Sequence, residues 1–298
     1  MHEREFHSAW IVGDDPLRTS GAASALFPWW SFTKTVLAVC VLKLWEQGRL
    51  DLDERLHGRP FTPHHLLQNR AGVPNYGRQP AYHEAVARGD TPWSREELLE
   101  RVQADRLDFE PGTGWSYSNV GFLLVRELIE ERTGQDLGAA IATLVADPLG
   151  LASVRLASSA TEFRDVHWEA VRDYDPRWVY HGCLIGTAGD ACRLLQALFG
   201  GRLLRPETLE CMLERHHLGD GIPGRPWTSH GYALGLMSGA VGSTGRAIGH
   251  SGAGPGCVNA VYHFPDLPRP VTVASFTDAH DEGVAEWEAL RIVSRLAR

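Results

Sequence analysis

A hydroxyl and an amine stand three positions apart, at Ser31 and Lys34, just before a mostly apolar run from Thr35 to Trp45. On a helix these two side chains lie on one face, one turn from each other. If Ser31 opens that helix, its Oγ also lies near unpaired backbone N–H groups and the positive end of the helix dipole. This spacing suits a serine nucleophile, with Lys34 as its proton acceptor or electrostatic partner.

The pair carries more information because lysine is rare in this chain. Of 29 basic residues only Lys34 and Lys43 are lysines. With 16 serines among 298 residues, the chance that either lysine follows a serine by three positions is roughly 0.1. A desolvated lysine can lose its proton, whereas arginine cannot. The alternative is that coding bias removed most lysines and Lys34 lies on a solvated turn. On this pair alone both interpretations stay open.

Two further polar groups adjoin predicted turns. Tyr117-Ser118-Asn119 occupies a tight loop before a helix, so Tyr117 and Asn119 can both point into a cleft. Alternatively, Asn119 caps the helix and Tyr117 packs on the surface. His250-Ser251-Gly252 ends a strand and enters a glycine-rich stretch. Its alternative is a hairpin turn that needs glycine φ angles.

The elements that position these residues follow from the hydrophobic pattern. Strands are predicted at one end of the chain and again near the other, with a mostly helical segment from Phe61 to about His217 between them. The expected strands are 5–13, 230–240, 244–252, 257–264 and 270–277, and the expected helices include 93–106, 120–132, 187–199 and 282–296. We therefore expect an α/β fold of the α+β type, an antiparallel sheet flanked by helices with an inserted helical domain. Residues 1–60 and 228–298 form the discontinuous sheet domain and residues 61–227 the helical domain, with the active site in the cleft between them.

Composition excludes several classes of function. A net charge of −8 and a pI near 5.9 argue against nucleic acid or an anionic membrane as partner. The segment from Met1 to Phe6 lacks a cationic stretch followed by an apolar one, so no secretory signal is expected. Five cysteines without a C-x-x-C pair indicate reduced thiols rather than disulfides or a zinc site. We expect a cytoplasmic protein.

Taken in this order, the three motifs resemble the serine β-lactamase and penicillin-binding-protein family. The branch in question includes class C β-lactamases, D-aminopeptidases and related esterases, which pair S-x-x-K with Y-x-N and a third K/H-x-G motif. The stretches Phe109–Gly121 and Gly182–Met212 are similar to this branch as well. The resemblance implies a β-lactamase/transpeptidase-like fold and no metal or organic cofactor.

The resemblance also implies roles for the first two motifs. Ser31 attacks a carbonyl and forms an acyl-enzyme, and Lys34 and Tyr117 together take its proton. Which of the two is the base stays open. Asn119 holds Lys34 and the substrate amide by hydrogen bonds.

The third motif is implied to bind the substrate. His250 lies opposite Tyr117, and Ser251 and Gly252 continue the strand beside the substrate. The backbone N–H groups of Ser31 and Ala253 form the oxyanion hole. Trp29, Trp30 and Trp115 flank the motifs and either wall an apolar acyl pocket or pack in the core.

Two departures from the family pattern bear on the substrate. His250 replaces the lysine usual in β-lactamases, which weakens the case for binding a β-lactam carboxylate. Leu66–Gly72 (LLQNRAG) stands where relatives often carry L-L-x-H-T-S-G, without an evident reason. We expect a hydrolase of small esters or amides, esterase-like. The alternatives are a β-lactamase or D-amino-acid-specific peptidase acting on a β-lactam-like or D-peptide substrate, and a non-catalytic ligand-binding homologue. The oligomeric state is not assigned.

Overall fold

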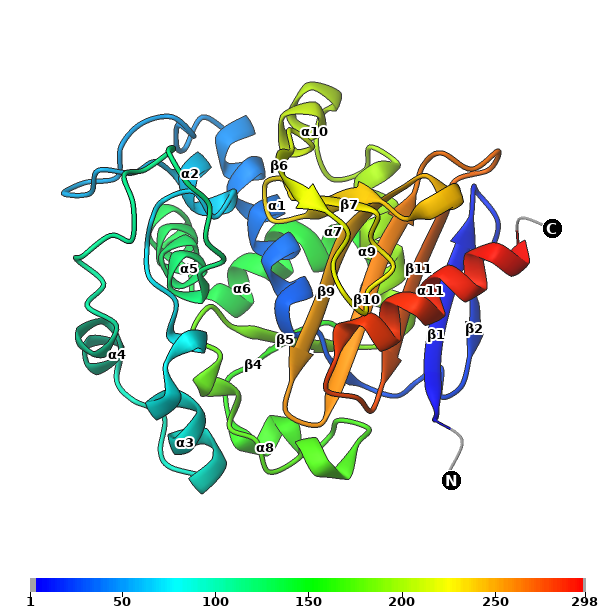
Figure 1. The fold of residues 1–298 in the computed structure, drawn as a ribbon, viewed down its shortest axis with the longest axis horizontal. Coiled ribbons are helices and arrows are strands. Elements are labelled where there is room, and N and C mark those ends of the chain that lie inside the picture. The colour runs from blue at the N-terminus through cyan, green and yellow to red at the C-terminus, as the bar shows by residue number, and fades with distance from the viewer. Residues whose placement is uncertain (1–3, 297–298) are drawn as a thin grey trace.

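One large antiparallel sheet organises the chain, of which the computed structural model describes residues 4–296 (Figure 1). Its strand order is β2-β1-β11-β10-β9-β8-β7-β6, so the N-terminal strand β1 pairs with the last strand of the chain, β11. The strands are β1 Phe6–Val12, β2 Arg18–Ser20, β6 His216–Asp220, β7 Ser229–Tyr232, β8 Met237–Ala240, β9 Arg246–Gly254, β10 Cys257–Phe264 and β11 Val271–Thr277.

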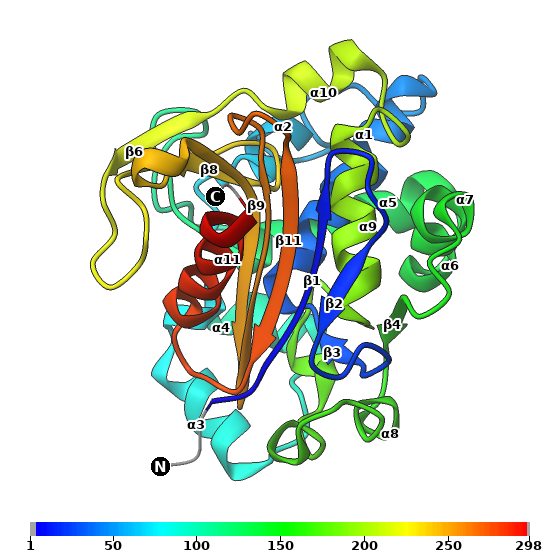
Figure 2. The same cartoon turned by 90° about the vertical axis from the view of Figure 1, so that its right-hand side faces the viewer.

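Helices cover both faces of this sheet, as the edge-on view in Figure 2 shows. On β10, Val258, Ala260 and Tyr262 pack with α11 (Glu282–Leu296), whereas Val261 faces the main core. This two-residue alternation puts successive side chains on opposite faces. Because both faces are covered, every residue of β10 is buried, including the polar Asn259 and His263.

On the opposite face from α11 lies α9 (Ala188–Phe199), which contacts β1 and β11. Helix α1 (Thr33–Glu46) is apolar nearly all round, and eleven of its fourteen residues are buried. Such a helix belongs in the interior. It packs against α5 (Asn119–Thr133), which places the helix that follows Ser31 at the centre of the molecule.

The remaining elements are short. A second sheet has the order β3-β5-β4, with β3 Phe27–Pro28, β4 Arg155–Ala157 and β5 Cys183–Gly186. The other helices are α2 Pro63–Leu67, α3 Pro80–Arg88, α4 Arg95–Arg101, α6 Leu137–Ile141, α7 Asp147–Leu149, α8 Ala160–Phe163 and α10 Pro206–Met212. Turns of 3₁₀ helix include Trp30–Phe32, Tyr76–Arg78 and Pro176–Trp178, and a π turn spans Ala142–Ala146.

The mixed α/β class, the antiparallel sheet and the flanking helices are as predicted, but several element bounds are wrong. The run 230–240 is two strands, β7 and β8, joined by a turn at Gly235. Gly235 has φ +70°, and a Cβ there would lie 2.5 Å from Ala38 Cβ, so the turn packs directly on α1. Strands β4 and β5 were not expected in the helical middle, nor was β6 at its end. The helix predicted to Arg106 ends at Arg101, although Ser94 caps its start.

The two-domain division stays a prediction. Within the segment assigned to the helical domain, α9 packs on the large sheet and β6 forms its edge. None of the described helices is long and apolar enough to cross a membrane. Residues 1–3, part of the segment searched for a secretory signal, lie outside the described range. The five cysteines are unpaired within it, and four of them are buried.

Candidate active site

Ser31 lies in the 3₁₀ turn that leads into α1, directly after a residue with an unusual backbone. Trp30 has φ +42°, which is rare for a residue with a side chain. Its ring is buried against Gly254, where a Cβ would lie only 2.4 Å away, and its Nε1 donates to Cys257 Sγ at 3.2 Å. Packing therefore holds Trp30 in this conformation and fixes the direction of Ser31. As the second residue of the turn, Ser31 has a backbone N–H without an acceptor inside the turn.

Lys34 is fully buried one turn later, so the interpretation as a solvated turn is wrong. Its Nζ lies 3.1 Å from Ser31 Oγ and 4.9 Å from the centre of the Tyr117 ring. Burial lowers the pKa of Lys34 well below its usual 10.5. The amine is thereby prepared to accept a proton rather than to carry one permanently.

Tyr117 approaches Ser31 from the loop before α5. Its hydroxyl donates to Ser31 Oγ at 2.9 Å. Burial raises the pKa of Tyr117 above its usual 10, although the hydrogen bond with Ser31 opposes the shift. The phenol is therefore protonated at neutral pH, and burial disfavours the charged form of both Tyr117 and Lys34.

The loop that carries Tyr117 is held by hydrogen bonds both to residues next to it in the sequence and to a residue far from it in the sequence. Ser118, not Asn119, caps α5, through Oγ and the N–H of Gly121. The N–H of Ser118 donates to Asn69 Oδ1 at 3.0 Å. Asn69 has φ +58° and belongs to LLQNRAG, the stretch that departs from the family pattern. That departure thus contains a residue that orders the Tyr117 loop.

Asn119 forms a hydrogen bond to a residue other than Lys34, its expected partner. Its Nδ2 donates to Asn75 Oδ1 at 3.2 Å. The second hydrogen-bond partner of Lys34 is instead His181, whose Nε2 lies 3.1 Å from Nζ. Neither Asn75 nor His181 stands in one of the three motifs, and no spacing marks them, because each reaches the site through tertiary contacts.

The third motif lies on β9 beside Ser31. His250 is buried, its Nε2 lies 3.0 Å from the hydroxyl of Tyr232, and its ring centre is 6.2 Å from that of Tyr117. It therefore lies near Tyr117, and its role in binding the substrate stays a prediction. Burial, and next the neighbouring Lys34, lower the pKa of His250 to about 3, so the ring is neutral. Where the usual family lysine would carry a charge, this residue carries none.

The strand continues directly past the nucleophile. A Cβ at Gly252 would lie 2.8 Å from the backbone nitrogen of Ser31, so this position has room only for glycine. Ala253 follows and lines the space in front of Ser31. The pairing of the Ser31 and Ala253 N–H groups as an oxyanion hole stays a prediction.

Two cavities meet at Ser31 and share Asn119 and Ala253 as walls. The first, of about 350 Å³, is mostly aromatic and apolar, and its lining includes Trp30, Tyr76, Tyr82, Val86, Tyr174 and His181. The second, of about 380 Å³, is more polar, and its lining includes Trp115, Tyr117, Arg225, His230, His250 and Glu282. Trp30 and Trp115 thus face cavities, whereas Trp29 is buried in the core.

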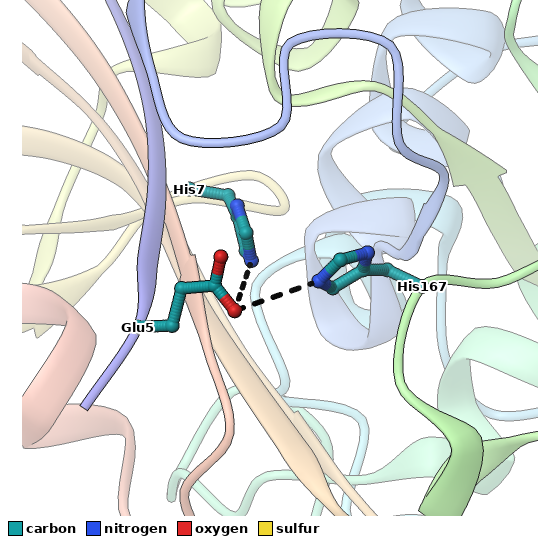
Figure 3. A group of neighbouring side chains, drawn as sticks. All are labelled: Glu5, His7 and His167. Carbon is teal, nitrogen blue, oxygen red and sulfur yellow. Dashed lines mark ion pairs between the residues drawn. The ribbon is translucent and has the colours of Figure 1, made fainter. Parts of the chain in front are cut away.

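A separate cluster could be considered for a metal. Glu5, His7 and His167 bring one ligand atom each within 4.8 Å of the others (Figure 3). However, His7 Nδ1 accepts the N–H of Ala22 at 2.9 Å. A neutral His7 then carries its proton on Nε2, the atom that points at Glu5 and would have to bind the metal. We therefore assign no metal to this cluster.

The fold and the site define the class of protein. An antiparallel sheet covered by helices on both faces, with serine, lysine and tyrosine gathered at the start of the central helix, is the arrangement of a β-lactamase/transpeptidase-type serine hydrolase. The family model described as "Beta-lactamase" matches residues 7–294, and the chain belongs to that family.

Relatives and solved structures agree. The chain is 27% identical to esterase EstB of Burkholderia gladioli, over 87% of this chain and 79% of the esterase. It is 24% identical to penicillin-binding protein 4* of Bacillus subtilis, over 89% of this chain and 63% of that protein. A D-stereospecific amidohydrolase from Streptomyces sp. is 27% identical with a TM-score of 0.75, covering 92% of this chain and 89% of its own. The D-amino acid amidase of Ochrobactrum anthropi SV3 shares the fold, with a TM-score of 0.81 at 22% identity, covering 98% and 94%.

Proposed function

We propose that this chain hydrolyses small carboxylic esters, and amides less readily, through an acyl-enzyme on Ser31. The observation that carries the proposal is the position of Ser31 Oγ, 3.1 Å from Lys34 Nζ and 2.9 Å from the Tyr117 hydroxyl. A serine with an adjacent base and an adjacent proton donor is the arrangement that nucleophilic catalysis requires. The named relatives include an esterase, and the family is one of hydrolases.

The reaction follows from the protonation states. Neutral Lys34 takes the Ser31 proton while Oγ attacks the carbonyl carbon, and the carbonyl electron pair moves onto oxygen. The N–H groups of Ser31 and Ala253 stabilise that oxyanion. As the intermediate collapses, the bond to the leaving group breaks, and the leaving atom takes a proton from Tyr117, which regains one from Lys34.

Deacylation reverses the same proton path. Water attacks the acyl carbon and loses a proton to the base, and Ser31 leaves with a proton returned by Lys34. Tyr117 lines the second cavity and not the first. We therefore place the leaving group in the second cavity and the acyl group in the apolar first cavity, whose aromatic walls suit an uncharged acyl chain.

The charges of the second cavity favour an ester over a β-lactam or a peptide with a free carboxylate. Arg225 is the one arginine among the described residues that line this cavity. Its Nε already donates a hydrogen bond to the buried Glu286 at 2.7 Å, so its charge is paired. Glu282 lines the same cavity and adds a negative charge. With His250 neutral, a carboxylate entering this cavity would meet no unpaired lysine or arginine among the described lining residues, which leaves its desolvation poorly compensated.

The experiment compares substrates on one enzyme. We expect a p-nitrophenyl butyrate to be hydrolysed with a higher kcat/KM than nitrocefin or D-alanine amide. Ser31→Ala should abolish the turnover, whereas Ser294→Ala, at an exposed position on α11, should leave it unchanged.

Three other results would change the proposal. Faster turnover of nitrocefin would make the chain a β-lactamase, and faster turnover of the D-amide a D-amidase. Failure of a fluorophosphonate to add to Ser31, seen by intact mass, would make it a non-catalytic homologue. The cytoplasmic location expected from the sequence stays a prediction.

A further inference from the structure

His181 is a buried histidine that the mechanism above does not use. It lies between the turn Pro176–Trp178 and strand β5, and it is 3% exposed. Its Nε2 is 3.1 Å from Lys34 Nζ, the same nitrogen that contacts Ser31. Its ring also lines the first cavity. Lys34 thus lies between a nucleophile and a heteroaromatic ring, with both within hydrogen-bond distance.

The protonation state of this ring follows from its surroundings. Burial, and next the neighbouring Lys34, lower the pKa of His181 well below its usual 6.5. His250 on β9 and Arg126 on α5 act in the same direction. The Cys183 thiol on β5 is neutral, since burial raises its pKa to about 12. The His181 ring is therefore uncharged at neutral pH and offers one donor and one acceptor.

The hydrogen bond decides which nitrogen carries the proton. A neutral Lys34 amine has one lone pair and two N–H donors. To act as a base it must direct the lone pair at Ser31, so an N–H remains for His181. His181 Nε2 must then be the acceptor and Nδ1 must carry the hydrogen. Nδ1 is buried and has no hydrogen-bond partner within residues 4–296. An unpaired buried N–H costs free energy, and an apolar side chain of the same size would fill the space without that cost.

We propose that His181 is a positioning residue for the base: its Nε2 accepts an N–H of Lys34 and so keeps the Lys34 lone pair on Ser31 Oγ. This inference rests on the proposed function. When Lys34 takes the Ser31 proton it becomes an ammonium with three donors, and the same bond to Nε2 remains and strengthens. No proton passes to His181, which stays neutral throughout. Its place in the wall of the first cavity means that a bound acyl group covers the Lys34–His181 bond from water.

Replacing the ring separates this role from a packing role. His181→Phe keeps the bulk but removes the acceptor, and His181→Gln restores an acceptor near the position of Nε2. We expect kcat for a p-nitrophenyl ester to fall about 10- to 100-fold in His181→Phe, with KM little changed, and to recover largely in His181→Gln. Because the lost bond stabilises the ammonium more than the amine, the acid limb of the pH profile should move to lower pH in His181→Phe and return in His181→Gln.

The base itself can be observed, because the chain has two lysines. Selective ¹³C and ¹⁵N labelling of lysine gives signals from Lys34 and Lys43 alone, and Lys43→Arg assigns them. We expect the Lys34 titration to move to lower pH in His181→Phe, to be near that of the wild type in His181→Gln, and to be unchanged in His263→Phe, at a buried histidine outside the site.

This measurement does not depend on turnover, so it distinguishes the two proposals. A wild type that fails to react with fluorophosphonate refutes the proposed function, and the mechanistic role of His181 with it. A reactive wild type whose Lys34 titration is the same in all variants refutes His181 as its partner while leaving the function intact. If His181→Phe does not fold, His181→Asn replaces it, because asparagine mimics Nδ1 and not Nε2. Equal titrations in the Asn and Gln variants would then overturn the proposal.

Discussion

Gly254→Ala probes how the nucleophile is held. An ideal Cβ at Gly254 would lie 2.4 Å from the ring of Trp30, where carbon atoms in contact stay about 3.5 Å apart. The ring cannot retreat freely. On its other sides it lies 5.8 Å and 5.6 Å, between ring centres, from Phe163 and Tyr174, and its Nε1 donates to Cys257. A shift of about 1 Å must therefore pass into the backbone of Trp30, which is bonded to Ser31.

Two magnitudes follow. Overpacking a buried site by one methyl group costs about 1–3 kcal/mol of unfolding free energy. A displacement of about 1 Å at the reacting atom lowers the rate about 100-fold. We expect Gly254→Ala to remain folded, to lose stability within that range, and to lose about 100-fold in kcat/KM for a p-nitrophenyl ester. Urea unfolding measures the first effect, and steady-state kinetics corrected by fluorophosphonate titration of intact sites measures the second.

Gly121→Ala is the matched control. It introduces the same methyl group inside α5, where the nearest atoms to a Cβ are 3.5 Å away in Ser118. There alanine should leave activity unchanged and stability equal or about 0.5–1 kcal/mol higher. A Gly254→Ala enzyme with normal rate and stability would refute the account of Trp30. The account would also be refuted if Gly254→Ala lost as much activity and stability in a Trp30→Phe background as in the wild type. If the smaller ring relieves the clash, the effects of the two substitutions must be non-additive.

Three further predictions concern protons. Tyr117→Phe should lower kcat/KM about 10²- to 10⁴-fold for amides and alkyl esters. The loss should be much smaller for p-nitrophenyl esters, because p-nitrophenolate leaves without a proton. Equal losses for both kinds of substrate would argue against Tyr117 as the proton donor to the leaving group. Lys34→Arg should fold poorly or be inactive in ester hydrolysis, since a buried guanidinium cannot become neutral; wild-type rates would contradict Lys34 as the base. Burial lowers the pKa of His263 to about 4, so the unfolded chain, near 6.5, binds the proton first as the pH falls. Urea unfolding should show the wild type losing about 3 kcal/mol more than His263→Asn between pH 7 and pH 4, and parallel curves would disprove the assignment.

The fold was predictable from sequence where one periodicity ran long enough to be unambiguous. Helix α11 has the predicted bounds, and α9 begins after its predicted Thr187. The failures come from short elements. Strands β4 and β5 have three and four residues, too few to distinguish an apolar strand from a turn of buried helix. The split of 230–240 was hidden because the reason for the turn, the contact of Gly235 with α1, is tertiary.

The candidate site divides in the same way. Ser31, Lys34 and Tyr117 belong to motifs whose spacing is local, and the structure brings their reactive atoms together. His181 lies 147 positions from Lys34, and Asn75 lies 44 positions from Asn119. Such partners have no sequence signature, because a hydrogen bond across the interior constrains geometry and leaves spacing along the chain free.

The burial of Lys34 offers a reason for a lysine at this position in a chain that otherwise uses arginine almost everywhere. A side chain enclosed by α1, the Tyr117 loop and His181 can carry a full charge only at a large desolvation cost. Arginine would have to bear that cost permanently, whereas lysine can lose its proton and, in the proposed mechanism, gain it again during each turnover. The environment that makes a charge expensive here is therefore also the one that makes an amine useful as a base. The apolar surroundings of the central helix therefore stabilise the fold and, in the proposed mechanism, also keep Lys34 able to act as the base for Ser31.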